Sequence, residues 1–186
     1  MTFDIAASLR RVKPQRSGLQ LSPRNEADLP FVTASIGPGA ELLLDTGIYI
    51  DILQARMPPE VKRLLASRTQ NHSSVALAEL THLFGRLDPN HKGTAASLAA
   101  LRLALDRIPQ HRLTAPSLRA CGEAGMLAGL AARLTGRAPG TELLNDALLF
   151  LQAGESGRTL LTSNIRDFDH LQQLAPWPQI LFYRRS

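Results

Sequence analysis

The sequence has 186 residues, of which 44% are hydrophobic and 20% charged, a balance typical of one globular domain rather than of a disordered chain. Its 21 Lys and Arg residues exceed its 16 Asp and Glu residues, and the resulting net charge of +5 is compatible with a polyanionic partner without indicating one. A single cysteine excludes an intramolecular disulfide and a cysteine-based zinc site, and with neither a signal peptide nor an apolar run of about 18 residues we expect a cytoplasmic protein without membrane association.

Residues 1–40 differ from the rest of the chain because they lack sustained hydrophobic periodicity. They contain several prolines and the turn Gly37-Pro38-Gly39, so we expect an irregular basic arm with at most a short helix or strand. Its charged residues are mostly basic: Arg10, Arg11, Lys13, Arg16 and Arg24 against Asp4, Glu26 and Asp28. Such an arm either contacts RNA or a partner, or docks on the domain or stays mobile; composition alone favours the second reading.

From residue 41 onward, short apolar runs alternate with amphipathic segments. We expect strands at 41–45, 69–74, 111–114, 158–162 and 179–183. We expect helices at 48–54, 58–67, 75–87, 92–108, 117–134, 142–153 and 166–174. The helix at 92–108 has the clearest apolar face, formed by Leu98, Leu101, Leu105 and Ile108. Strands that alternate with helices in this way predict a parallel sheet covered by helices, which is an α/β fold.

Four acidic residues follow strands or interrupt otherwise apolar helices. Asp45 directly follows the buried run Leu42-Leu43-Leu44, at the strand end where open parallel sheets place their sites, and Asp167 comes shortly after the strand at 158–162. Glu79 and Asp146 each lie in a helix that is otherwise nearly all apolar, where a carboxylate faces solvent on a narrow stripe or is buried with a partner. Taken singly, each also fits helix capping or simple exposure.

Together, these carboxylates indicate a metal site. Clustered carboxylates repel one another, and oxygen ligands favour a hard divalent cation such as Mg²⁺ or Mn²⁺. Such a cation suits phosphodiester hydrolysis, because it orients a water molecule and balances the charge that develops on the phosphate. Asp169 is a rival to Asp167 for the fourth position, since it lies only two residues further along the chain.

Four segments resemble the four motifs of PIN-domain proteins, in the order and with the spacing of that family. They are LLDTGIYI at 43–50, SSVALAEL at 73–80, LNDA at 144–147 and LTSNIRDF at 161–168. The stretch at 120–134 is similar to the helix that precedes the third motif in VapC-type toxins. No single motif is specific to the family. The ordered set of four, which covers residues 41–183, is a strong resemblance.

The resemblance implies that residues 41–186 form a PIN domain, a three-layer α/β/α sandwich around a central, mostly parallel sheet. It implies a Mg²⁺- or Mn²⁺-dependent endoribonuclease acting on single-stranded RNA, a homodimer, and the role of a VapC-like toxin neutralised by a cognate antitoxin. By position, Asp45, Glu79 and Asp146 match the three main acidic residues of the family, and Asp167 matches its more variable fourth. We expect four further residues to line the site or contact substrate: Thr46, Thr162, Asn164 and Arg166.

The chain also departs from the family pattern. Gly47 stands where Asn or Ser is common, Ala76 where a hydroxyl residue is frequent, and Cys121 where an aromatic residue is often found. The first forty residues have no counterpart in the minimal toxin. These departures leave the four carboxylates intact, but they leave two alternatives open: a catalytically weak PIN module that binds RNA or a protein partner, and a nuclease directed at DNA.

Overall fold

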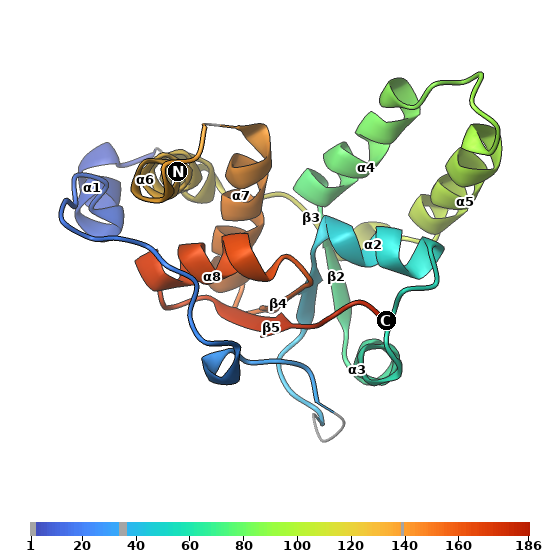
Figure 1. The fold of residues 1–186 in the computed structure, drawn as a ribbon, viewed down its shortest axis with the longest axis horizontal. Helices are drawn as coiled ribbons and strands as arrows, with labels where there is room; N and C mark the ends of the chain where they lie inside the picture. The colour runs from blue at the N-terminus through green and yellow to red at the C-terminus, as the bar shows by residue number, and fades with distance from the viewer. Residues whose placement is uncertain (1–2, 34–36, 139) are drawn as a thin grey trace.

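The structure is a computed structural model that describes residues 3–33, 37–138 and 140–186 (Figure 1). Its centre is a five-stranded sheet in the order β3-β2-β1-β4-β5, in which every pairing between strands is parallel. The strands are β1 (Leu42–Leu44), β2 (Gln70–Ser73), β3 (Leu113–Thr114), β4 (Thr159–Thr162) and β5 (Gln179–Phe182). The parallel sheet expected from the alternating pattern is therefore confirmed.

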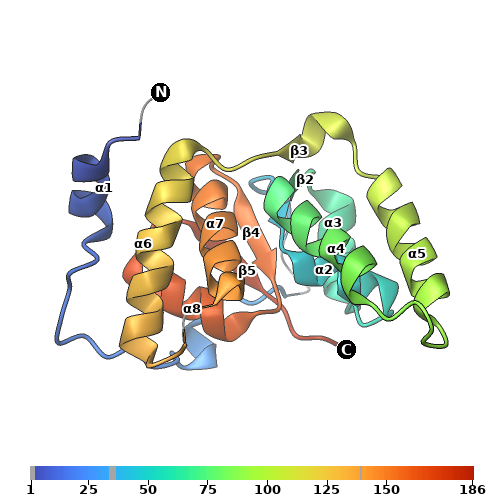
Figure 2. The ribbon, with the colours of Figure 1, turned by 90° about the horizontal axis from the view of Figure 1, so that it is seen from above.

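Helices cover the sheet on both sides. They are α1 (Ile5–Val12), α2 (Thr46–Leu53), α3 (Pro59–Ser67), α4 (Ser74–Arg86), α5 (Thr94–Asp106), α6 (Leu118–Thr135), α7 (Thr141–Glu155) and α8 (Ile165–Leu174). Figure 2 shows α1, α6 and α7 on one side of the strands and α2, α4 and α5 on the other. The arrangement is the three-layer α/β/α sandwich that the sequence resemblance predicts. No helix in the described part of the chain is long and apolar enough to span a bilayer.

Local signals place most element boundaries within a few residues of those expected. Ser117 caps α6 by accepting a hydrogen bond from the Ala120 backbone N–H, and Gly136 ends that helix in the left-handed conformation with φ +66°. One expectation was wrong in part: the segment at 111–114 is not a full strand. Gln110–Arg112 forms a 3-10 helix, and only the two residues of β3 pair with β2.

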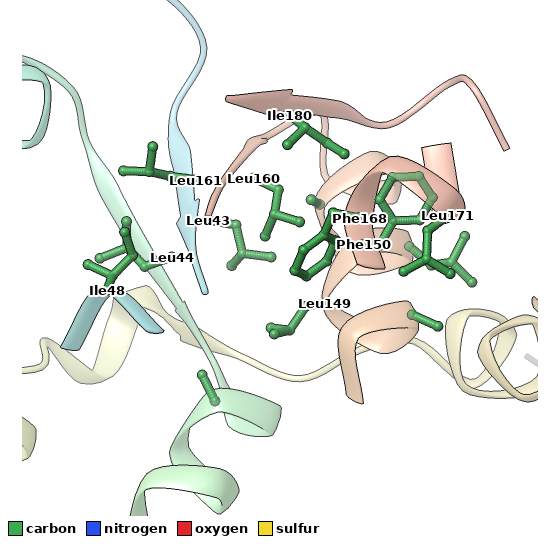
Figure 3. Packing of buried hydrophobic residues seen from close by; sticks show 14 of the residues in the cluster. Leu43, Leu44, Ile48, Leu149, Phe150, Leu160, Leu161, Phe168, Leu171 and Ile180 are labelled. Atoms are coloured by element: carbon green, nitrogen blue, oxygen red, sulfur yellow. The ribbon is translucent and has the colours of Figure 1, made fainter. Parts of the chain in front are cut away.

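The core packs between the sheet and the helices on both of its sides, and Figure 3 shows part of it. All three leucines of β1 are buried, as are Leu160 and Leu161 of the neighbouring β4. Phe150 of α7 and Phe168 of α8 are wholly buried against this layer. Burial of such a side chain contributes roughly 1.5–3 kcal/mol, so this continuous apolar layer holds the carboxyl ends of β1 and β4 in place.

Residues 3–33 wrap around the domain and share its core. This segment contains α1 and a short 3-10 helix at Glu26–Asp28, and four of its apolar side chains are buried in the main cluster: Val12, Leu21, Leu29 and Val32. Phe31 extends the sheet through a parallel bridge to Phe182. The arm expected to be irregular is thus partly helical and docked. Its residues 1–2 and 34–36 lie outside the described residues.

Candidate functional site

The carboxyl ends of β1 and β4 meet at the centre of the sheet. These strands are neighbours, with Leu44 in register with Leu161, although the chain forms β2 and β3 between them. The chain leaves β1 toward one edge of the sheet and leaves β4 toward the other. Such a switch of direction opens a crevice at the carboxyl ends of the two strands, which is where open α/β sheets bind ligands.

A pocket of about 1100 Å³ occupies this position. All four carboxylates predicted from the sequence line it, and they come from four different elements: Asp45 from the start of α2, Glu79 from α4, Asp146 from α7 and Asp167 from α8. Thr46 and Asn164, also predicted at the site, line the same pocket. The fold thus brings together groups that are up to about 120 residues apart in sequence.

Asp45 and Glu79 are held by neutral donors. Asp45 occupies the N-cap position of α2 but makes no capping hydrogen bond with its side chain; instead its Oδ2 accepts a hydrogen bond of 2.7 Å from the hydroxyl of Thr162. Glu79 accepts hydrogen bonds from the hydroxyl of Thr46 and from the amide of Asn145, the latter at 2.8 Å. The capping alternative for Asp45 therefore does not account for its carboxylate, which is left to face the pocket.

Asp146 and Asp167 are linked through a shared amide. The Nδ2 of Asn164 donates to Asp146 at 3.0 Å and to Asp167 at 3.2 Å, while its backbone N–H donates to the Thr162 hydroxyl at 2.9 Å. Asp167 also forms an ion pair with Arg137. Asn164 thus orients two carboxylates at once.

The carboxylates disturb one another electrostatically. Burial, followed by the negative charges of Asp45, Asp167 and Glu79, raises the pKa of Asp146 to about 9. Burial likewise raises the pKa of Asp45 to about 6, against the lowering effect of the Thr162 hydrogen bond and with a further increase from Glu79. Two neighbouring carboxyls with raised pKa values mark a site where a cation would stabilise the ionised forms.

The donor set fits a hard divalent cation in its chemistry. Every candidate ligand is a carboxylate oxygen, as Mg²⁺ and Mn²⁺ prefer. Within the described residues, no three His, Cys, Asp or Glu side chains already converge as a closed set of metal ligands. Each carboxylate bonds to a hydroxyl, an amide or a guanidinium instead, so binding a cation would require these side chains to turn toward a common point.

Three predicted residues do not line the pocket. Thr162 is wholly buried and contacts the site only through its hydrogen bond to Asp45. Arg166, expected to line the site, is exposed on α8 and is not among the residues that line the pocket. Asp169 is buried away from the pocket, where its carboxylate accepts hydrogen bonds from the backbone N–H of Arg24 at 2.9 Å and from its Nε at 2.5 Å. Of the two rivals for the fourth acidic position, Asp167 is the one that lines the pocket.

Sequence reasoning missed several residues around the pocket: Arg137, Asn145, Ser163 and Arg185, and the buried Asp51 behind them. Asn145 is next to a predicted carboxylate and could have been suspected from that position alone. Arg137 follows the end of α6, and Arg185 follows β5, so neither belongs to a motif or to an element with a readable pattern. Their positions depend on how distant segments pack.

The half of the pocket remote from the carboxylates is apolar. It is lined by side chains of α2, α4, α5 and the turn after α4: Ile50, Leu53, Leu83, Leu87, Leu98 and Leu101. A second, smaller pocket of about 580 Å³ adjoins it, because Glu79, Leu83 and Glu142 line both. Glu79 of the acidic centre therefore borders both pockets.

A scan of family models and a search of curated proteins found no match to this sequence. Solved structures do match. A chain of VapBC2 from Rickettsia felis, bound to a DNA fragment from its promoter, is 22% identical, with a TM-score of 0.53 over 77% of this chain and 98% of that chain. The chain has the PIN-like fold.

Two further structures support this PIN-like fold. A chain of the DNA-bound VapBC from Salmonella typhimurium is 22% identical, with a TM-score of 0.53 over 76% of this chain and 97% of that chain. A chain of FitAcB from Neisseria gonorrhoeae is 18% identical, with a TM-score of 0.54 over 76% of this chain and 96% of that chain. At these identities the likeness shows a shared fold, and the chemistry has to be argued from the site itself.

Proposed function

We propose that this chain is a divalent-metal-dependent endoribonuclease that hydrolyses phosphodiester bonds of single-stranded RNA. The observation that carries the proposal is the set of four carboxylates that line one pocket, Asp45, Glu79, Asp146 and Asp167, among which the pKa values of Asp45 and Asp146 are raised. Structural carboxylates are normally paired or exposed, and gathering four in one pocket costs free energy unless a cation joins them.

In this proposal, Asp45, Glu79 and Asp146 hold the cation directly or through water, and Asp167 completes the set. A bound Mg²⁺ or Mn²⁺ would supply an oriented, polarised water and balance the charge on the phosphate. The surrounding side chains position the ligands. Thr162 orients Asp45, while Thr46 and Asn145 orient Glu79. Asn164 holds Asp146 and Asp167 side by side, and Arg137 restrains Asp167 from the other side.

We further propose that the protein is a VapC-like toxin whose cognate antitoxin covers the acidic pocket. The support is twofold: the sequence motifs resemble those of VapC-type toxins, and the solved structures that share the fold include VapBC and FitAcB complexes. The homodimer that the resemblance also implies remains a prediction, which light scattering on the purified protein would check. As a toxin, the chain expressed alone should arrest bacterial growth, and its Asp146→Asn variant should not.

The direct test is a cleavage assay with three proteins: the wild type, Asp146→Asn, and Asp106→Asn as a control on the exposed face of α5. Single-stranded RNA, single-stranded DNA and duplex RNA of one sequence are offered with Mg²⁺, with Mn²⁺ or with EDTA. We expect the wild type and the control to cut single-stranded RNA only with a metal, and Asp146→Asn to lose at least 100-fold in rate, as is typical when a group that acts on the reacting charge is removed.

Other outcomes would separate the alternatives. Cleavage that is equal in the wild type and in Asp146→Asn, and insensitive to EDTA, would refute the role of the carboxylates. Preferential cleavage of DNA would assign the same site to a DNA-directed nuclease. Tight binding of RNA without cleavage under either metal would favour a binding module over an enzyme.

A further inference from the structure

The residues that follow β5 are fixed against the acidic site. Tyr183 donates its backbone N–H to the carbonyl of Thr162 at 3.0 Å, and the N–H of Ser186 donates to the carbonyl of Arg56 at 3.1 Å. Figure 1 shows this end of the chain running from β5 toward α2 and the loop that follows it. Arg185 lies between these two backbone anchors, so its position is determined by the fold on both sides.

Asp51 of α2 holds the side chain of Arg185. Its carboxylate is wholly buried and accepts hydrogen bonds from the Tyr183 hydroxyl at 2.7 Å and from Nε of Arg185 at 3.0 Å. It also pairs with Arg56 at 2.8 Å. Burial alone would raise the pKa of Asp51, but the hydrogen bonds from Tyr183 and Arg185 outweigh it and hold that pKa below its ordinary value. Asp51 is therefore a fixed negative charge.

Arg185 presents the rest of its guanidinium to the pocket. The residue lines the pocket and its side chain is 49% exposed. In the described part of the chain, the only hydrogen-bonding or ion-pair partner found for this guanidinium is Asp51, which binds Nε and leaves both Nη nitrogens free. A Cβ placed on Gly47 would lie 3.9 Å from Nη2 of Arg185 and 3.5 Å from Oδ2 of Asp45, so both groups border the same glycine.

The position of the Arg185 guanidinium can offset the repulsion between the acidic pocket and the phosphates of a nucleic acid. The carboxylates repel a phosphodiester strand, and a cation among them would coordinate directly only the phosphate that it contacts. A guanidinium beside the carboxylates offers two further donors in a planar fork that matches two phosphate oxygens. Because Gly47 has no side chain, no Cβ stands between Asp45, the hydroxyl of Ser163 and Arg185. The mouth of the pocket is therefore suited to a neighbouring phosphate of the same strand.

We propose that Arg185 binds a backbone phosphate of a single-stranded nucleic acid next to the carboxylate cluster, and that Asp51 holds its guanidinium in position. The inference rests on the proposed function, because it assumes that the pocket takes a nucleic-acid strand. By binding this phosphate, Arg185 would fix the register of the nucleic-acid strand in the pocket, as phosphate contacts do in protein–nucleic acid complexes.

The neighbouring arginine provides a matched control. Arg184 carries the same charge at the adjacent position, but it pairs with Glu26 and lies over the ring of Phe31, 5.6 Å from its centroid. Arg185→Gln and Arg184→Gln therefore remove the same charge at neighbouring positions with different surroundings. Asp51 keeps Arg56 and Tyr183 as partners in either variant, so both should remain folded, which circular dichroism would verify.

Binding is measured by fluorescence anisotropy with a fluorescein-labelled 12-nucleotide oligouridylate, in an Asp146→Asn background with Mg²⁺ present, over a range of salt concentrations. We expect Arg185→Gln to weaken binding about 10-fold and to reduce the salt dependence by about one phosphate contact. Arg184→Gln should stay within about twofold. Arg185→Lys keeps the charge but loses the fork, so it should restore only part of the affinity.

Equal losses in the two Gln variants would overturn the inference, because net charge would then explain the effect, and so would wild-type affinity in Arg185→Lys. The proposed function can fail separately. If the wild-type chain cleaves no RNA or DNA but Arg185→Gln still binds much more weakly than Arg184→Gln, only the nuclease proposal fails. If the chain cleaves RNA and the two Gln variants bind alike, only the Arg185 inference fails.

Discussion

Replacing Asp146 with Asn should stabilise the protein in the absence of metal. The carboxyl of Asp146 has its pKa raised from 3.8 to about 9, first by burial and then by Asp45, Asp167 and Glu79. The folded state therefore keeps a proton that the unfolded state releases, so stability falls as pH rises from about 4 to about 9. At pH 7, keeping this proton in the folded state costs about 4 kcal/mol relative to a carboxyl with the ordinary pKa of 3.8. Since the pocket is open to water, we expect roughly half, about 2 kcal/mol.

An amide does not ionise, so the Asp146→Asn variant avoids this penalty. In EDTA, urea unfolding followed by circular dichroism should show the variant to be more stable than the wild type by about 2 kcal/mol at pH 7, with a smaller gap at pH 5 and a larger one at pH 8. For a chain of this size, that corresponds to a rise of roughly 4–8 °C in Tm. The exposed Asp106→Asn control should change neither. A variant that is no more stable than the wild type, or a gap that does not change with pH, would refute this reading of the electrostatics.

Three further predictions concern the contacts that hold the N-terminal arm and the core around the site. Arg24→Gln leaves the buried carboxylate of Asp169 without its cation, so it should cost about 1–3 kcal/mol and make residues 13–33 sensitive to limited proteolysis; unchanged cleavage patterns would show that the arm is held by other contacts. Gly154→Ala places a methyl group against the ring of Trp177, so it should cost about 1–3 kcal/mol and shift the fluorescence of this single tryptophan, whereas an unaltered spectrum would argue against that packing. Phe168→Ala removes a wholly buried ring and should cost roughly 3–5 kcal/mol in urea unfolding; a loss below about 1 kcal/mol would contradict the position of the core.

Much of the fold is predictable because the central strands β1 and β4 are buried on both faces. The run Leu42-Leu43-Leu44 is continuous rather than alternating, and all three side chains are buried, as expected for a central parallel strand. The segment at 111–114 was harder to predict, since its few apolar residues do not distinguish an edge strand from a 3-10 turn. Strand order was also beyond reach, because a single sequence carries no information about which strands are neighbours.

The candidate site also contains some residues that the sequence could predict and others that it could not. Asp45, Glu79 and Asp146 could be predicted because each carboxylate stands in an apolar context, where an unpaired charge is costly. Arg137 and Arg185 could not, because they follow helix and strand ends. Only tertiary packing pairs Arg137 with Asp167 and places Arg185 at the pocket. The ion pair that docks the N-terminal arm joins Arg24 and Asp169, which are 145 residues apart. No local sequence pattern predicts this pairing.

The central claim is that the acidic pocket holds a divalent cation, and Mn²⁺ binding measured by electron paramagnetic resonance tests it without reference to any substrate. We expect the wild type and Asp106→Asn to bind Mn²⁺ with the same affinity, Mg²⁺ to compete for the site, and Asp146→Asn to bind at least 10-fold more weakly. Binding should also strengthen as pH rises, because the pKa of Asp146 near 9 means that its carboxyl must lose a proton to become a ligand. Absence of binding by the wild type, or equal affinity in Asp146→Asn, would contradict the claim.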